Sequence, residues 1–204
     1  MTSAITDPVT LARLRHRAVV LAWATIAWNV VEAVVAIGAG LEAGSLALVG
    51  FGLDSTIEVG SAAVILWQFA GTDELRERQA LRLIAVSFFA LAAYVTVQAV
   101  VDLATISEPD TSVLGIVLAA LSLVVMPLLA TAKRRTGERL GSVTVAADSQ
   151  QTWLCTYLSA VLLAGLVLNA AFAWWWADPA AGLVIAVLAM REGREAWAGD
   201  TCCD

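Results

Sequence analysis

Six apolar segments, each roughly as long as a membrane-spanning helix, follow one another along this chain of 204 residues. They lie near residues 18–38, 46–70, 83–104, 112–131, 149–172 and 178–190. A helix needs about 20 apolar residues to cross the hydrocarbon core of a bilayer. Open sheet edges cannot sit in lipid, and the segments lack the alternating pattern of a membrane β-barrel. The chain is 60% hydrophobic, against about 45–50% apolar residues in soluble domains. We therefore predict an all-α membrane protein of six transmembrane helices.

The predicted organisation is a single six-helix transmembrane domain over residues 18–190. Residues 1–17 and 191–204 form short tails, of which the second is too short to fold alone. The N-terminal residues lack the apolar core and the cleavage site of a secretory signal. We therefore expect the first segment to remain in the mature protein.

The 12 basic residues are confined to the N-terminal tail, the second and fourth connections, and the C-terminal tail. They are Arg13, Arg15, Arg17, Arg76, Arg78, Arg82, Lys133, Arg134, Arg135, Arg139, Arg191 and Arg194. By the positive-inside rule both termini are cytoplasmic, and we expect a multi-pass protein of the cell membrane. Because no Lys, Arg or His falls within a predicted segment, we expect no internal ion pair for buried acidic residues. No basic patch with interleaved aromatic residues is present, so nucleic acid is not an expected partner.

Two acidic residues interrupt the second apolar segment. Asp54 and Glu58 are four positions apart, so a helix places both on one face. A carboxylate in hydrocarbon costs about a few kcal/mol or more, which makes such a residue a candidate functional group. We predict that the pair binds one cation. The alternative is that both residues only form hydrogen bonds with neighbouring helices.

A polar stripe on the fifth segment offers the matching half of such a site. Asp148, Gln151 and Cys155 recur at i, i+3 and i+7, which is one face of a helix. The second and fifth segments cross the membrane in opposite directions, and a rise of about 1.5 Å per residue puts Glu58 and Cys155 at similar depth. We predict a metal site of four ligands, with Asp148 as a substitute or as the first ligand that an arriving ion meets. The four ligands are Asp54, Glu58, Gln151 and Cys155.

The donor types indicate which metal suits this site. Carboxylate oxygen and thiolate sulfur both bind Zn²⁺ in near-tetrahedral geometry, whereas Mg²⁺ and Ca²⁺ prefer shells of oxygen alone. Gln151 is the weakest ligand and could instead form a hydrogen bond between helices. Cys155 could simply pack as a small apolar residue. Asn29 and Glu32 share a face of the first segment, where they could line the ion's path, orient its ligands, or only contribute polar groups to helix packing.

The three cysteines form no disulfide framework. For Cys202 and Cys203 we expect a reduced tail, with metal binding and lipidation as the alternatives. A thiol-redox enzyme is disfavoured, because the chain has no C-x-x-C motif and the adjacent pair would face the reducing cytoplasm. We therefore expect a protein that is not an enzyme.

These motifs resemble the cation diffusion facilitator family of metal transporters over essentially the whole chain. Members open their second span with small residues, as in GSLAL here, and carry an acid-x-x-x-acid pair, here Asp54 and Glu58. Their fifth span reads AD and then two ligands four residues apart, usually His or Asp followed by Asp. These two positions fall on Gln151 and Cys155. Their sixth span opens with DP and an apolar run, here ADPAAGLVIAVLAM.

The resemblance implies six spans with cytoplasmic termini and the export of Zn²⁺, or a similar divalent transition-metal ion, by proton-coupled alternating access. It implies no cofactor, since the metal ion is the substrate, and it names protons and the lipid bilayer as partners. Two features differ from the family. Gln and Cys replace the usual ligand pair, which removes at least one negative charge. The C-terminal cytoplasmic domain is absent, so we expect a tail-less subgroup and a homodimer formed through the transmembrane helices. The alternative is a non-transporting membrane metal sensor or partner subunit derived from such a transporter.

Overall fold

The computed structural model describes residues 8–70, 74–106 and 108–198, and these form six α-helices and no strand. The helices are α1 (Pro8–Ala43), α2 (Leu46–Ala70), α3 (Glu74–Thr105), α4 (Val113–Leu140), α5 (Val143–Phe172) and α6 (Ala177–Ala198). The predicted all-α fold is confirmed over this part of the chain. Cys202 and Cys203 lie outside the described residues.

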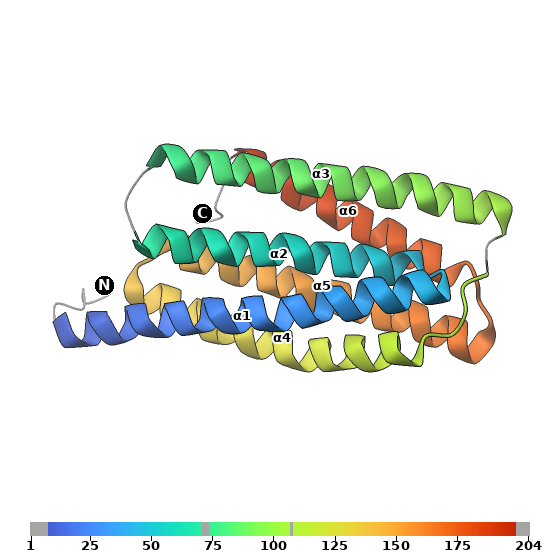
Figure 1. Ribbon diagram of the computed structural model, residues 1–204, viewed down its shortest axis with the longest axis horizontal. Coiled ribbons are helices and arrows are strands. Elements are labelled where there is room, and N and C mark those ends of the chain that lie inside the picture. The colour runs from blue at the N-terminus through green and yellow to red at the C-terminus, as the bar shows by residue number, and fades with distance from the viewer. Residues whose placement is uncertain (1–7, 71–73, 107, 199–204) are drawn as a thin grey trace.

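The six helices lie side by side, roughly along the long axis of the molecule (Figure 1). α1 packs chiefly against α2, α4 against α5, and α3 against α6. The first two pairs contact each other through α1 and α4 and through α2 and α5, while α3 and α6 both pack on α2. The starts of α1, α3 and α5 and the ends of α2, α4 and α6 share one end of the bundle, at the left of Figure 1. The basic residues of the sequence belong to these helix ends, which is the pattern that the positive-inside rule requires.

Two apolar cores hold the described part of the bundle together. The larger lies between α1, α2, α4, α5 and α6 and includes Phe51, Met126 and Leu158, all with exposed fractions near zero. The smaller lies between α2, α3 and α6 around Phe88 and Val95. Most of the buried charged side chains belong to helices that form the larger core.

Five of the described helices, α1 to α5, are long and apolar enough to cross a membrane. α6 is not among them, because its uncharged stretch between Asp178 and Arg191 is shorter than the about 20 residues that a span needs. Several helices continue beyond the apolar segments into their charged ends. In particular α4, whose apolar segment ends near residue 131, continues to Leu140 and so contains Lys133.

A two-residue connection joins α4 to α5. Gly141 follows α4 with φ of 61°, a left-handed conformation that favours glycine. Ser142 caps α5 by accepting a hydrogen bond from the backbone N–H of Val145. Such a short connection makes the two helices antiparallel neighbours, and residues about two turns from it on either helix can face each other. Lys133 and Asp148 occupy such positions.

Among the described residues, glycine lets α1 and α2 approach closely at two places. A Cβ at Gly40 would lie 2.8 Å from the backbone N of Val49, and one at Gly52 would lie 3.0 Å from the backbone N of Ile37. A larger side chain at either position would push the helices apart. The close contact holds Glu32 of α1 against α2.

Asp178 fixes the opposite end of the bundle. Its carboxylate accepts hydrogen bonds from Ser45 Oγ and, at 3.2 Å, from the backbone N–H of Ala47, in the first turn of α2. A carboxylate satisfies the free N–H groups of a helix start and interacts favourably with its dipole. The acidic residue of the DP motif therefore joins α6 to α2, and Pro179 takes its place in the first turn of α6, where proline is tolerated.

Candidate functional site

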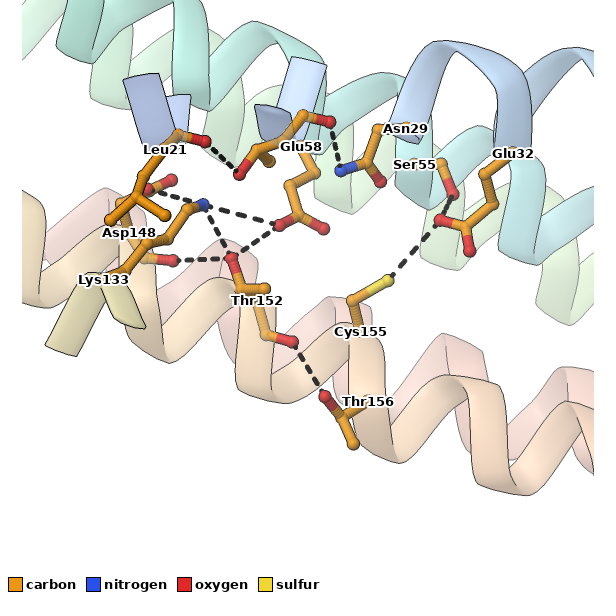
Figure 2. Close-up of polar contacts among 11 residues, drawn as sticks. Leu21, Asn29, Glu32, Ser55, Glu58, Lys133, Asp148, Thr152, Cys155 and Thr156 are labelled. Carbon is orange, nitrogen blue, oxygen red and sulfur yellow. Dashed lines mark hydrogen bonds and ion pairs between the residues drawn. The ribbon is translucent and has the colours of Figure 1, made fainter. Parts of the chain in front are cut away.

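Buried charged side chains gather in the interior between α1, α2, α4 and α5. They are Glu32, Asp54, Glu58, Lys133 and Asp148, none of them more than 5% exposed. Figure 2 labels all of these except Asp54. Because Asp54 and Glu58 are buried inside the bundle, they do not face the lipid. Carboxylates at such a position require opposite charges, hydrogen bonds or a bound cation.

Lys133 supplies an opposite charge in the half of this site nearer the α4–α5 connection. Its Nζ lies 2.7 Å from Asp148 Oδ2 and 4.0 Å from Glu58 Oε1. It also donates a hydrogen bond of 2.8 Å to Thr152 Oγ1, which donates one of 2.7 Å to Glu58 Oε1. The expectation that buried acids lack an internal basic partner is therefore wrong. It failed because α4 continues past its apolar segment, and because helical side chains lean toward the N-terminus, which carries this ammonium deeper into the bundle.

One oxygen of each carboxylate in this network has no partner among the described residues. Glu58 Oε2 and Asp148 Oδ1 are buried there without a hydrogen bond, as are Asn29 Oδ1 and Gln151 Nε2. A buried polar atom left unpaired costs about 1–3 kcal/mol. Such atoms are rare in folded proteins and call for a specific explanation, such as a bound ion or water. The two carboxylate oxygens can accept a cation directly, and Gln151 can present its oxygen by rotating its amide.

A second polar cluster surrounds Glu32. Ser55 Oγ donates a hydrogen bond of 2.8 Å to Glu32 Oε2, and Ser122 Oγ donates one to Oε1. Cys155 Sγ lies 3.9 Å from Glu32 Oε2, within reach for a sulfur donor. Figure 2 shows the thiol between Glu32 and Glu58. Glu32 therefore contacts one of the predicted metal ligands.

Asn29 lies one turn before Glu32 on the same helix. Its Nδ2 donates a hydrogen bond of 3.0 Å to the backbone oxygen of Thr25, within α1. Its side-chain oxygen is thereby left buried and available to the interior. Asn29 does not bond directly to the described acidic side chains, so its place on the ion's path stays a prediction.

The four predicted ligands come from α2 and α5, which pack against each other. Asp54, Glu58 and Cys155 are buried and Gln151 is half-buried. Within the described ranges, no three His, Cys, Asp or Glu side chains are placed so that they could hold one metal ion. Instead, the residues labelled in Figure 2 follow the helices in a row from Asp148 past Glu58 to Glu32. The four-ligand site stays a prediction, and forming it requires these side chains to rotate toward a common centre.

Four polar residues that were not predicted to belong to the site complete this row. They are Ser55, Ser122, Lys133 and Thr152. Thr152 was detectable, because it lies four residues after Asp148 on the same helical stripe. The two serines were not, because serine in an apolar segment is also typical of ordinary helix packing.

Two comparisons with known proteins bear on this arrangement. Residues 81–197 match the family model of the cation efflux transmembrane domain. That range runs from α3 into α6 and includes Lys133, Asp148 and Cys155. The chain is also similar to transmembrane protein 163 of Xenopus laevis, with 24% identity over 184 residues. The alignment covers 88% of this chain and 66% of the relative, so the chain spans about two thirds of the relative's length.

Proposed function

The chain belongs to the cation efflux family, and from this membership we propose that it exports a divalent transition-metal ion, Zn²⁺ above all, from the cytoplasm. The ion follows the buried carboxylates between α1, α2, α4 and α5. One observation carries the proposal: Glu58 Oε2 and Asp148 Oδ1 are buried and have no partner among the described residues. Carboxylate oxygens that face the interior in this way are ready ligands for a cation.

The donor types support Zn²⁺ as the substrate. Cys155 Sγ lies 3.9 Å from Glu32 Oε2, so a soft sulfur and a hard oxygen are close together in the interior. Zn²⁺ accepts both donors, whereas Mg²⁺ and Ca²⁺ prefer oxygen alone. An ion held by Asp54 and Glu58 could add Cys155 and Gln151 as ligands after the side-chain rotations described above.

The balance of buried charge supports coupling to protons. Glu32, Asp54, Glu58 and Asp148 are all buried, and Lys133 is the one buried basic side chain among the residues whose exposure is described. Uncompensated charges in an apolar interior are costly, so protons or metal ions must neutralise the excess. Metal binding requires deprotonated ligands and therefore releases protons. Protons that return from outside would then displace the metal ion on the far side.

Transport completes the cycle by alternating access, in which the helices rock around a site near the middle of the membrane. We place the protein in the cell membrane, with its termini in the cytoplasm, as a homodimer formed through its helices. The basic helix ends that share one end of the bundle support the orientation.

A non-transporting metal sensor or partner subunit is the second candidate function. It is supported by Gln151 and Cys155, which stand where the family usually has a His or Asp followed by an Asp. Such a protein would bind Zn²⁺ in detergent and would show no flux in proteoliposomes.

The experiment that tests the proposal measures Zn²⁺ uptake into proteoliposomes that enclose a fluorescent zinc indicator. The wild type is compared with Glu58→Gln, which removes the charge of a buried carboxylate, and with Glu42→Gln, which removes that of an exposed one on the same bundle. We expect uptake by the wild type and by Glu42→Gln, and the level of empty liposomes for Glu58→Gln. Equal uptake by all three proteins would contradict the proposal. Zn²⁺ binding without uptake by the wild type would select the sensor.

A further inference from the structure

Lys133 differs from every other basic residue that the structure describes. It is the single lysine of the chain, and its side chain is 1% exposed. Every arginine whose exposure is described is, in contrast, exposed. A buried ammonium is costly unless it is paired, so its position in the interior calls for a specific role.

The Lys133 ammonium occupies the position that a bridging cation would take. Its Nζ is 2.7 Å from Asp148 Oδ2 on α5 and 4.0 Å from Glu58 Oε1 on α2. It thus connects carboxylates from two helices, while Thr152 links the ammonium to Glu58 by hydrogen bonds. Figure 2 shows the lysine side chain reaching between these groups. The second oxygens of both carboxylates are left without partners among the described residues.

We propose that Lys133 is an internal counter-cation, which neutralises Glu58 and Asp148 while no metal ion is bound and is displaced when a divalent ion reaches them. The inference rests on the proposed function and adds a competitor that sets the affinity of the same site. A dication and an ammonium cannot share these carboxylates, because like charges a few ångströms apart in an apolar interior repel strongly. The lysine has a route away, since its flexible four-carbon stem can carry the ammonium toward the charged end of α4.

This role has consequences that differ from those of a purely structural ion pair. The competitor weakens metal binding, so that the ion can leave the site again. Removal of its charge should strengthen Zn²⁺ binding, whereas a structural partner of Asp148 would leave the affinity unchanged or lower it. Binding should also change the surroundings of the lysine itself, and a single lysine can be observed without any substitution.

The first test uses wild-type protein in detergent, labelled with ¹³C- and ¹⁵N-lysine so that one side chain gives the signal. Zn²⁺ alone is titrated, and its binding is measured in parallel by equilibrium dialysis. We expect the Lys133 side-chain signal to shift with the same saturation curve as binding. Binding with an unmoved lysine signal would overturn the inference and leave the proposed function intact. Absence of any Zn²⁺ binding would overturn both.

The second test compares Zn²⁺ affinity in three variants. Lys133→Met should bind Zn²⁺ tighter by about tenfold or more, because a neighbouring like charge has been removed. Lys133→Arg keeps the charge and should not tighten binding. Arg135→Met changes the net charge equally at an exposed position of the same helix and should behave as the wild type. Equal affinities for Lys133→Met and wild type would overturn the inference. If Lys133→Met does not fold, the labelled wild type still decides.

Discussion

Lys133 Nζ and Asp148 Oδ2 lie 2.7 Å apart across the α4–α5 pair, with side chains 1% and 3% exposed. A buried ion pair adds little net stability relative to apolar residues of the same size. Removal of one partner is a different matter, because it leaves the other charge buried and unpaired. We therefore expect a large coupling energy between Lys133 and Asp148, although the pair as a whole adds little to the free energy of unfolding.

A double-mutant cycle measures that coupling. Lys133→Met and Asp148→Asn should each lower the free energy of unfolding in detergent by about 3–5 kcal/mol, the usual cost of breaking a buried pair. The double variant should lose clearly less than the sum. The exposed pair Arg134 and Glu138, with side chains 65% and 58% exposed, is the matched control. Its coupling should stay below about 0.5 kcal/mol, and equal coupling in the two cycles would contradict this account.

The close approach of α1 and α2 predicts opposite effects for two glycines of α2. Gly52→Ala puts a Cβ 3.0 Å from the backbone N of Ile37 and should destabilise the protein by about 1–3 kcal/mol. Gly60→Ala meets no atom within 4 Å and should stabilise the helix by about 0.5–1 kcal/mol. Thermal unfolding in the same detergent compares the two. Equal or reversed shifts would show that the helices do not pack as described.

The thiol of Cys155 should set the metal preference. In Cys155→Ser a hard hydroxyl replaces a soft sulfur, so Zn²⁺ uptake should fall more than Mn²⁺ uptake in proteoliposomes. Ser159→Ala serves as control, because that hydroxyl bonds to the backbone oxygen of Cys155 within α5. It should leave the ratio of the two rates unchanged. An unchanged ratio of Zn²⁺ to Mn²⁺ uptake in Cys155→Ser would mean that the thiol only packs against its neighbours and does not select the metal.

Glu32 should matter for flux although it lies outside the predicted ligand set. Glu32→Gln keeps the side-chain shape and removes a charge that faces Ser55 and Cys155. We expect strongly reduced Zn²⁺ uptake with an unfolding temperature close to that of the wild type. Asp102→Asn, at a half-buried position of α3 where the carboxylate accepts a hydrogen bond from Gln98, should leave uptake unchanged. Normal uptake by Glu32→Gln would remove Glu32 from the path.

The positions of the helices could be predicted from the sequence, because apolar runs and segregated arginines reflect the membrane itself. The second segment, predicted over residues 46–70, coincides with α2 (Leu46–Ala70). The acidic pair was found in the same way, because carboxylates are conspicuous in an apolar run. The contacts between helices could not be predicted from apolar runs and the positions of charged residues. They depend on how each helix is rotated about its axis, which hydropathy does not determine.

Lys133 shows most clearly that hydropathy does not predict which side chains turn inward. The sequence places it beside Arg134 and Arg135, where a solvated cytoplasmic end is the natural interpretation. Only the rotation of α4 and the short connection at Gly141 turn this one side chain inward, while both arginines stay exposed. Glu32 is a similar case, because its partners Ser55 and Ser122 come from two other helices.

Zn²⁺ uptake into proteoliposomes with an acidic lumen, measured for the wild type and for Asp54→Asn, tests the central claim most directly. If buried carboxylates exchange a divalent ion for protons, wild-type uptake should be faster than at equal pH on the two sides, and Asp54→Asn should show none. Wild-type uptake that is absent or indifferent to the proton gradient, or undiminished uptake by Asp54→Asn, would contradict the account.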